Sequence, residues 1–193
     1  MNGQTNTIKA IQGLLGVTQD GLWGPKTQAA LDALIKPPSG ATDEDPHFVG
    51  DGTWPWINAK IDGGDILITG AVVTAFGGDS DKMDSGETAS GFSTKDNPSF
   101  LGCALPMRRD SNPQLRGSPI PKLPWKTLVE FSDPVTGKTV VTKLIDEGPA
   151  KWTKHGGDMS VAAAKEFDPN ATSNNFEKVL NIRIVGGAKY VTA

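Results

Sequence analysis

Two aspartates in the C-terminal half have the residue type and spacing for acid–base chemistry. Asp146 ends a predicted strand, and Asp158 stands twelve positions later (158 − 146) at the start of a predicted helix. One connecting loop of that length can bring both carboxyls into a single cleft. A helix N-terminus lowers the pKa of a carboxyl and apolar surroundings raise it, so the pair would have separated pKa values. Two such carboxyls are the usual equipment for cleaving a glycosidic bond.

The loop that joins the two aspartates carries two more candidates for a ligand site. Trp152 offers an aromatic face to a sugar ring, and His155 could enter the same cleft. A structural interpretation of the aspartates stays open at this point. Asp is a favoured helix N-cap, so Asp158 could simply cap a helix over Met159 to Phe167, and Asp146 could brace the Gly-Pro turn that follows it.

Other residue types argue against a disulfide, a thiol nucleophile or a metal site. Cys103 is the single cysteine and has no nucleophile signature around it, which favours a buried small hydrophobe. The two histidines are far apart in the sequence and have no clustered ligands beside them. Asp79, Asp81 and Asp84 lack the Gly and Glu spacing of a calcium loop and indicate a solvated loop. We expect no metal and no cofactor.

The elements that would position these residues are mainly short strands. β-Branched runs bounded by turn residues predict four strands, at 66–74, 127–131, 139–145 and 180–185. The turn residues of 133–138 should join the second and third strands as a hairpin. Several short strands and one alanine-rich helix in about 140 residues predict a small closed β-barrel.

The N-terminal segment has the pattern of a small helical unit. Apolar residues recur at helical spacing from Ile8 to Leu15 and from Ala29 to Ile35, with a glycine-punctuated loop between them. The following stretch, Lys36 to Pro46, holds three prolines and no apolar periodicity, which predicts an extended linker. The predicted boundaries are 1–36 for the helical domain, 37–52 for the linker and 53–193 for the barrel.

The composition argues against several classes of function. A net charge of −3 at pH 7 gives no basic face for nucleic acid. No apolar run is long enough to span a membrane, so we expect no membrane insertion. The first residues lack the basic and apolar regions of a signal peptide, and the sequence leaves open whether a signal was removed or another export route is used. The 23 glycines and 14 prolines indicate many turns and favour β structure.

Residues 5–36 resemble the common peptidoglycan-binding domain of cell-wall hydrolases. The resemblance is densest in the string Asp-Gly-Leu-Trp-Gly-Pro-Lys-Thr at 20–27. It is carried by Ile11, Gln12, Leu15, Gly16, Asp20, Gly21, Trp23, Gly24, Pro25, Thr27, Ala30 and Leu31. It implies a small three-helix unit in which Trp23 and Asp20 contact the wall. The alternative role of Trp23, as the core plug of a very small domain, stays open.

Two stretches of the C-terminal part look like the double-psi β-barrel of the rare lipoprotein A and expansin group. In 70–91 a strand precedes Asp-Ser-Gly-Glu-Thr-Ala-Ser-Gly, and in 143–164 a strand ends in Asp-Glu-Gly-Pro before Gly-Gly-Asp-Met-Ser opens a helix. They are more distantly similar to membrane-bound lytic transglycosylase A and family-45 endoglucanases. The match covers 66–187 and implies a six-stranded barrel with Asp146 and Asp158 as catalytic residues. With the loop residues above, the candidate substrate contacts are Thr88, Ser90, Trp152 and His155.

The sequence departs from that group in one respect. The active lipoprotein-type enzymes carry a His on the strand before a Leu-Pro segment, whereas 102–107 here reads Gly-Cys-Ala-Leu-Pro-Met, and an additional segment, Arg108 to Ser118, follows. Two hypotheses therefore stand. The first is an extracytoplasmic, monomeric protein, mainly β with a small all-α domain, that binds bacterial peptidoglycan and cleaves its glycan strands as a lytic transglycosylase or related enzyme. The second is a non-catalytic, expansin-like protein that loosens the wall.

Overall fold

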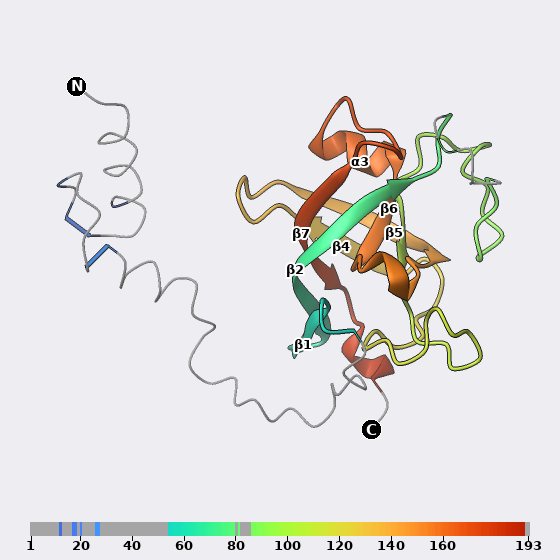
Figure 1. Ribbon diagram of the computed structural model, residues 1–193, viewed down its shortest axis with the longest axis horizontal. Helices are drawn as coiled ribbons and strands as arrows, with labels where there is room; N and C mark the ends of the chain where they lie inside the picture. Colours follow the sequence, from blue (N-terminus) through green and yellow to red (C-terminus); the bar gives the residue numbers. More distant parts are fainter. Residues whose placement is uncertain are drawn as a thin grey trace. The chain divides into compact units, whose positions relative to one another are not determined.

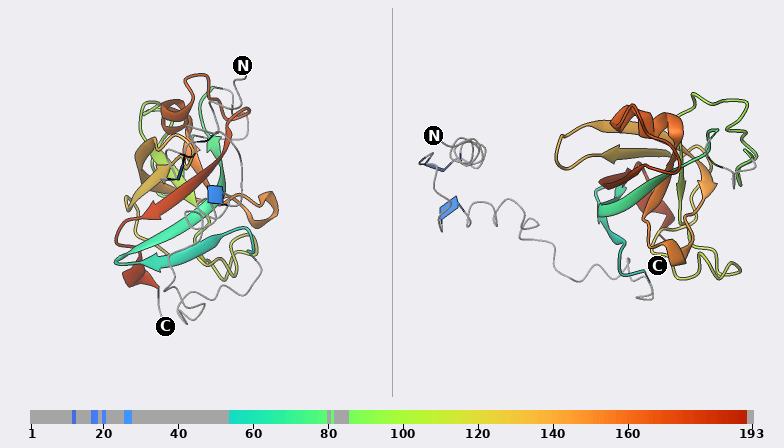
Figure 2. Two further views of the ribbon diagram at one scale, coloured as in Figure 1. Left: turned by 90° about the vertical axis from the view of Figure 1, so that its left-hand side faces the viewer. Right: turned by 45° about the horizontal axis from the view of Figure 1, so that its top comes forward.

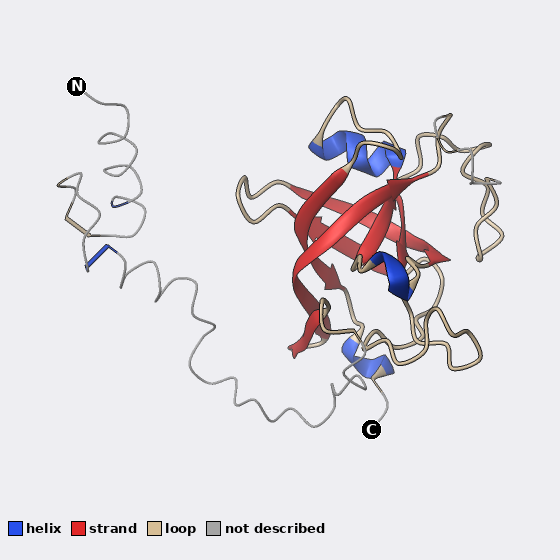
Figure 3. Ribbon diagram, in the orientation of Figure 1, coloured by secondary structure: helices blue, strands red, loops and turns tan. Residues whose placement is uncertain are grey.

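The computed structural model describes residues 12, 17, 18, 20, 26, 27, 54–79, 81 and 86–191. The chain divides into two compact units, Met1–Asp45 and Pro46–Ala193. In the second unit the strands form a barrel and the helices are few and short (Figure 3). None of the helices within the described residues is long and apolar enough to cross a membrane.

Six strands close into a mixed β-barrel, and a seventh pairs on its outside (Figures 1 and 2). The strands are β1 (Asn58–Asp62), β2 (Asp65–Phe76), β3 (Gly102–Leu105), β4 (Leu128–Ser132), β5 (Thr139–Glu147), β6 (Gly157–Ser160) and β7 (Glu177–Ile184). Their order is β1-β2-β6-β3-β5-β4-β7, and pairing of β7 with β2 closes the barrel. The pairs β2–β6 and β3–β5 are parallel and the others antiparallel. The predicted mainly β fold with a six-stranded barrel is confirmed.

The residue pattern predicted the longer strands and missed the short ones. The predictions at 66–74, 127–131, 139–145 and 180–185 correspond to β2, β4, β5 and β7, and β4 and β5 form the predicted hairpin. The strands β1, β3 and β6 were not predicted. Four residues in β3 and β6 show too little alternation to stand out, and β1 lacks the run of β-branched and aromatic residues that marks the equally short β4.

The long strand β2 contains a β-bulge that changes which of its residues face the core. Its register with β7 shifts between Ile68 and Ala71. Gly70 lies in the bulge with φ +66°, a left-handed conformation that glycine adopts without a Cβ clash, and its N–H donates to Asn181 Oδ1 at 3.1 Å. The buried positions are even-numbered before the bulge and odd-numbered after it.

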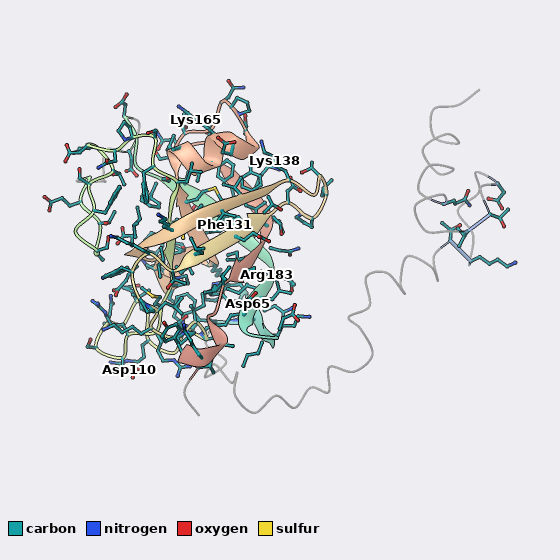
Figure 4. The ribbon with its side chains drawn as sticks, turned by 180° about the vertical axis from the view of Figure 1, so that it is seen from behind. Asp65, Asp110, Phe131, Lys138, Lys165 and Arg183 are labelled. Carbon is teal, nitrogen blue, oxygen red and sulfur yellow. The ribbon has the colours of Figure 1, made fainter. Side chains whose placement is uncertain are left out.

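Aliphatic side chains fill the interior of the barrel. The largest fully buried side chains are Phe131, Ile66, Ile68, Leu105, Met107, Ile120, Leu144, Ile145, Met159, Leu180, Ile182 and Ile184. Phe131 lies in the middle of β4 (Figure 4), and its complete burial contributes about 1.5–3 kcal/mol relative to exposure. On the outside, Arg183 Nη1 lies 3.4 Å from Asp65 Oδ2 and links β7 to the start of β2.

The predicted hairpin turn is held by one carboxylate. Asp133 N donates to Lys138 O at 2.9 Å, and Asp133 Oδ1 accepts from the backbone N–H of Val135 at 2.8 Å. Asp133 Oδ2 also accepts from Lys178 Nζ of β7 at 2.8 Å. The lysine and the backbone donors hold the pKa of Asp133 well below its usual range, so the carboxylate ties the hairpin to β7 throughout the neutral range.

The predicted helix start is wrong by two residues, and the predicted capping role of Asp158 is wrong with it. The helix α3 spans Val161–Phe167, and its N-cap is Ser160, whose Oγ accepts from Ala163 N at 3.3 Å. Asp158 lies in β6, inside the barrel sheet. Its carboxyl therefore gains nothing from a helix N-terminus, and the interpretation of Asp158 as a cap is excluded.

Six residues of the N-terminal unit are described, and three of them form a hydrogen-bonded cluster. The buried Gln12 donates through Nε2 to Asp20 Oδ1 at 2.7 Å and to Thr27 Oγ1 at 3.0 Å. This cluster ties the two ends of the 20–27 string to the preceding helical position. The described residues do not support three helices, and most of the predicted helical domain, Trp23 included, lies outside them.

Strand β6 joins the barrel wall through a close approach that only glycine allows. A Cβ on Gly156 would lie 2.7 Å from the Cβ of Ala71, and the Gly156 N–H donates to Val72 O at 2.8 Å. A Cβ on Gly157 would also be tight, at 3.3 Å from two core side chains. Gly156 therefore lets the chain pass close to β2, and Gly157 fits against the core side chains Ile182 and Leu105. Both glycines thus help to position β6 and Asp158.

We expect Gly156→Ala to reduce the free energy of unfolding by about 1–3 kcal/mol, because the added methyl group overpacks the contact with Ala71. Urea unfolding followed by far-UV circular dichroism measures the change. Gly64→Ala is the matched control, since a Cβ there meets nothing within 4 Å, and it should change the stability by less than about 0.5 kcal/mol. Equal stabilities of the two variants would contradict the proposed close approach.

Candidate active site

Five strands contribute one row of side chains to the barrel wall. Pairing places Glu177 of β7 beside Thr74 of β2, and Thr74 beside Asp158 of β6. Asp158 pairs in turn with Ala104 of β3, and Ala104 with Asp146 of β5. Paired residues on neighbouring strands project to the same face of a sheet. The row therefore brings the two predicted aspartates to one face, with Ala104 between them.

This row faces away from the barrel interior. The sequence neighbours of its members, among them Val73, Cys103 and Met159, belong to the hydrophobic core. Because side chains alternate along a strand, Thr74 and Asp158 project to the outer face, where both are partly buried. The candidate site is thus a patch of the outer wall that neighbouring loops partly cover.

Asp146 reaches this face because of a second β-bulge. Cys103 pairs with Leu144, but the next residue of β3 pairs with Asp146, so Ile145 is the extra residue. Without the bulge, alternation from the inward-facing Leu144 would turn Asp146 into the core. The Ile145 side chain packs over Gly102, where a Cβ would lie only 2.4 Å from Ile145 Cδ1. A side chain at position 102 would therefore displace the end of the Ile145 side chain.

Asp158 is the centre of a polar cluster. Thr74 Oγ1 donates to Asp158 Oδ1 and lies 3.3 Å from His155 Nδ1. The other ring nitrogen, His155 Nε2, is 3.8 Å from Glu177 Oε2. The side chain of His155 is 25% exposed and that of Glu177 is 69% exposed, so the cluster runs from the wall of the barrel to solvent.

Burial raises the pKa of the Asp158 carboxyl above its ordinary value, because the ionised form loses hydration. The Thr74 hydrogen bond and the charge of His155 act against this rise, and the Asp146 carboxylate adds to it. A helix N-terminus would have lowered the pKa of Asp158, so the observed shift has the opposite direction. A carboxyl whose pKa is raised keeps its proton closer to neutral pH and can serve as a general acid.

Asp146 holds a loop against the end of β5. Its Oδ1 accepts from Ala89 N at 2.9 Å and from Glu147 N at 2.8 Å. The loop carries two of the predicted substrate contacts, Thr88 and Ser90, whose hydroxyl oxygens are 2.9 Å apart. Thr88 is buried, whereas Ser90 is partly exposed. Of the predicted polar contacts, Ser90 is thus the better placed to meet a ligand beside Asp146.

The spacing of the two aspartates limits what they can do together. They stand on strands separated by β3, which corresponds to about 10 Å between their Cα atoms. The carboxyls of retaining glycosidases, in which one is the nucleophile, are only about 5–5.5 Å apart. The strand spacing is closer to the separation of about 6.5–9.5 Å between the carboxyls of inverting glycosidases. The raised pKa of Asp158 makes it the better candidate for an acid, whereas Asp146 positions the 88–90 loop.

The additional segment that follows β3 braces the other side of β5. Arg109 Nη2 lies 2.7 Å from Glu147 Oε1, and the Glu147 side chain is only 8% exposed. Gln114 O accepts from Lys151 N at 2.9 Å. The segment Arg108 to Ser118 thus supports both the end of the Asp146 strand and the start of the loop that leads to Asp158.

The tryptophans divide into packed and exposed residues. Trp54 is buried and donates through Nε1 to Arg116 O at 2.9 Å, and its ring lies 5.3 Å from that of Trp56. Trp56 and Trp125 pack partly buried against the core. Trp152, by contrast, is 75% exposed and lies in the short 3-10 helix η1 (Lys151–Thr153) between the two aspartate strands. It is the aromatic side chain of this loop that a ligand can reach.

Cys103 is fully buried, and this burial raises the pKa of its thiol to about 12. The thiolate that a cysteine nucleophile needs is therefore not formed at neutral pH. Within the described residues, which do not include Asp84, there is no group of three or more His, Cys, Asp or Glu side chains that could hold a metal ion.

A separate groove of about 910 Å³ opens beside α3, where β2 and β6 end at Phe76 and Ser160. Its lining carries both signs of charge, from Asp79, Asp81, Lys95 and Lys165. The Asp81 carboxylate accepts from Gly77 N at 3.0 Å, which ties this acidic loop to the end of β2. The groove adjoins the outward row two residues further along the same strands.

The sequence analysis missed two members of the site, Thr74 and Glu177. Thr74 was visible as a polar residue that ends a β-branched run, but its partnership with Asp158 depends on the parallel pairing of β2 with β6. Glu177 lies at the first position of β7, outside the predicted strand 180–185. Of the other predicted contacts, Asp20 is an exposed residue of the N-terminal unit, and Trp23 lies outside the described residues.

We expect Asp158→Asn to increase the free energy of unfolding at pH 7. The folded-state pKa of Asp158 is raised, so its contribution to stability is fully present below the unfolded value of about 3.9 and is lost as the pH rises through the folded value. The advantage of the variant over the wild type should therefore grow from pH 4 to pH 8. Urea unfolding at several pH values measures it, with the exposed Asp110→Asn (Figure 4) as control. A difference that does not vary with pH would contradict the burial of this charge.

Comparison of the sequence with models of protein families and with curated proteins finds no match.

Proposed function

We propose that this chain binds bacterial peptidoglycan and cleaves its glycan strands, with the Asp158 carboxyl as the acid and base. The observation that carries the proposal is the setting of Asp158: a partly buried carboxyl on an outer wall, with a raised pKa and a hydrogen bond from Thr74. A proton donor of this kind is what cleavage of a glycosidic bond requires. The closed, mixed six-stranded barrel is compatible with the double-psi type that the sequence resembles.

The reaction that one carboxyl can perform is a lytic transglycosylation. The neutral Asp158 carboxyl gives its proton to the glycosidic oxygen as the C1–O bond breaks, and the leaving sugar departs with a hydroxyl group. The Asp158 carboxylate then takes the proton of the C6 hydroxyl as that oxygen bonds to C1, which closes an anhydro ring. The acid is regenerated, and no water is consumed.

The neighbouring residues have supporting roles in this proposal. Asp146 holds the 88–90 loop at the edge of the row, and Ser90 and the exposed ring of Trp152 contact the glycan strand. Ala104, the small buried residue between the two aspartates on β3, adds no charge to the row.

The N-terminal unit serves as a wall anchor in this proposal. Gln12, Asp20 and Thr27 are linked by hydrogen bonds, which supports a defined conformation for the string that resembles peptidoglycan-binding domains. Trp23 lies inside that string and would supply the aromatic contact. A wall substrate implies that the protein works outside the cytoplasm, as a monomer with peptidoglycan as its partner.

The second candidate is an expansin-like protein that binds and loosens the wall without cleaving it. One observation favours it: Oδ1 of Asp146 accepts from two backbone N–H groups, which gives this carboxylate a structural role in holding the 88–90 loop. The residue between the aspartates on β3 is Ala104, and the matching stretch 102–107 contains no His. Glycan binding on the same row would then be the whole function.

We expect the protein to release soluble anhydro-muropeptides from purified sacculi, as detected by mass spectrometry. Asp158→Asn should reduce the rate about a hundred- to ten-thousandfold, because it removes the proton donor and keeps the shape. Asp146→Asn is the matched control. Its amide oxygen can still accept from Ala89 N, so it should lose less than about tenfold.

Three outcomes of this assay are distinguished. Products with reducing ends would show that the protein is a hydrolase and not a transglycosylase. Release of soluble products by Asp158→Asn at the wild-type rate would contradict catalysis by this carboxyl. Wild-type protein that binds and loosens sacculi without releasing products would support the expansin-like candidate.

We expect the N-terminal unit to increase retention on insoluble peptidoglycan. In the full chain, Trp23→Ala should weaken co-sedimentation with sacculi by roughly tenfold or more, as is typical of an aromatic anchor. The exposed Lys26→Ala in the same string is the control and should have little effect. Equal recovery of the intact chain and of a shortened chain that begins at Asp45 would contradict the anchor.

A further inference from the structure

Backbone hydrogen bonds of His155 and of the next residue, Gly156, fix the position of His155. Its N–H donates to Thr153 Oγ1 at 3.2 Å, and the next residue, Gly156, donates to Val72 O at 2.8 Å. The preceding Lys154 has a positive φ of 61°, which turns the chain at this point. The imidazole is therefore directed at β2 by a fixed loop, and its 3.3 Å contact with Thr74 is part of the packing of β6 against β2.

The Thr74 hydroxyl has a single proton, and this makes its two contacts interdependent. While it donates to Asp158 Oδ1, its oxygen can only accept from His155, so Nδ1 must carry a proton. If the hydroxyl turned to donate to His155, Nδ1 would have to be unprotonated, and Asp158 would lose its donor. The protonation of the imidazole and the hydrogen bond to the carboxyl are thus linked through one rotatable group.

The charges around the cluster favour the first arrangement. Glu177 of β7 faces Nε2 at 3.8 Å and favours a proton on that nitrogen as well. Asp146 of β5 acts on Asp158 from the far side of β3 through its charge, and β3 itself contributes the uncharged Ala104 to the row. His155 therefore lies in a row with three acidic side chains from three strands, Glu177, Asp158 and Asp146.

We propose that His155 is a positioning residue for Asp158. In its protonated form it fixes the Thr74 hydroxyl in the orientation that donates to the Asp158 carboxylate and it supplies the compensating positive charge. When the Asp158 carboxyl is protonated, the Thr74 hydroxyl is no longer needed as a donor to it. The arrangement stabilises the carboxylate that remains after a proton has been given away, without any contact between His155 and the substrate.

The inference deepens the proposed function, and its catalytic meaning rests on that function. The coupling between His155 and Asp158 is nevertheless a property of the free protein. It can be measured without a glycan, so its failure and the failure of glycan cleavage are separate results.

The test is the titration of the Asp158 carboxyl carbon by NMR in carbon-13-labelled protein without substrate. In His155→Asn, whose amide can occupy the position of Nδ1 but cannot become charged, we expect the pKa of Asp158 to be higher than in the wild type. Lys154→Gln removes a positive charge from the neighbouring position of the same loop, one that does not contact Thr74, and should leave the titration unchanged. His155→Gln is the second variant if His155→Asn does not fold.

Thr74→Val tests the route of the coupling, because it keeps the shape and removes the hydroxyl. It should raise the pKa of Asp158 by itself, and His155→Asn should then add less in the Thr74→Val background than in the wild type. An Asp158 titration that is the same with and without His155 would overturn the proposal. Fully additive effects of the two substitutions would also overturn it, since they would show that Thr74 does not transmit the coupling. A merely structural role of His155 would lower the melting temperature and leave the titration unchanged.

Discussion

The register of the four-residue strand β6 is the constraint on which the rest of the site depends. In this register Met159 enters the core and Asp158 faces outward between Thr74 and Ala104. A slip of one residue would exchange these two side chains and place a carboxyl in the apolar interior. The glycines 156 and 157 support this register, because a Cβ on Gly156 would clash with Ala71 of β2 and a Cβ on Gly157 would be tight against Ile182 and Leu105.

Two β-bulges bring further polar side chains to the same outer face as Asp158. The bulge at Gly70 changes the phase of β2, so that Thr74 faces outward although the first half of the strand has its buried residues at even positions. The bulge at Ile145 does the same for Asp146 at the end of β5. Each extra residue interrupts the hydrogen bonds between two strands. In return, the polar side chains of β2 and β5 lie on one face of the barrel wall. Without the bulges, the alternation of side chains along each strand would place them on opposite faces.

The burial of Asp158 has opposite effects on stability and on the proposed chemistry. A partly buried carboxyl is unfavourable for the folded state once it is ionised, and the Thr74 hydrogen bond and the nearby His155 offset this only in part. The same burial is what raises the pKa toward the range in which a general acid is useful. The apolar core and interactions such as the Asp133–Lys178 ion pair stabilise the fold and offset this unfavourable free energy.

The sequence by itself determined the local elements, and the tertiary structure decided the site. The β-branched runs of β2, β4, β5 and β7 and the turn at 133–138 were readable because strand alternation and turn chemistry are local properties. The local pattern also identified Asp146 and Asp158, but it placed Asp158 at the start of a helix and left a capping role open, since a single Asp before an alanine-rich helix satisfies the local rule. The sequence could not predict the short strands β3 and β6 or the bulge at Ile145. It also could not predict the cluster that Asp158 forms with Thr74, His155 and Glu177. They depend on pairing between segments as much as 103 residues apart (Thr74 and Glu177, 177 − 74), and this pairing is fixed only when the barrel closes around its core.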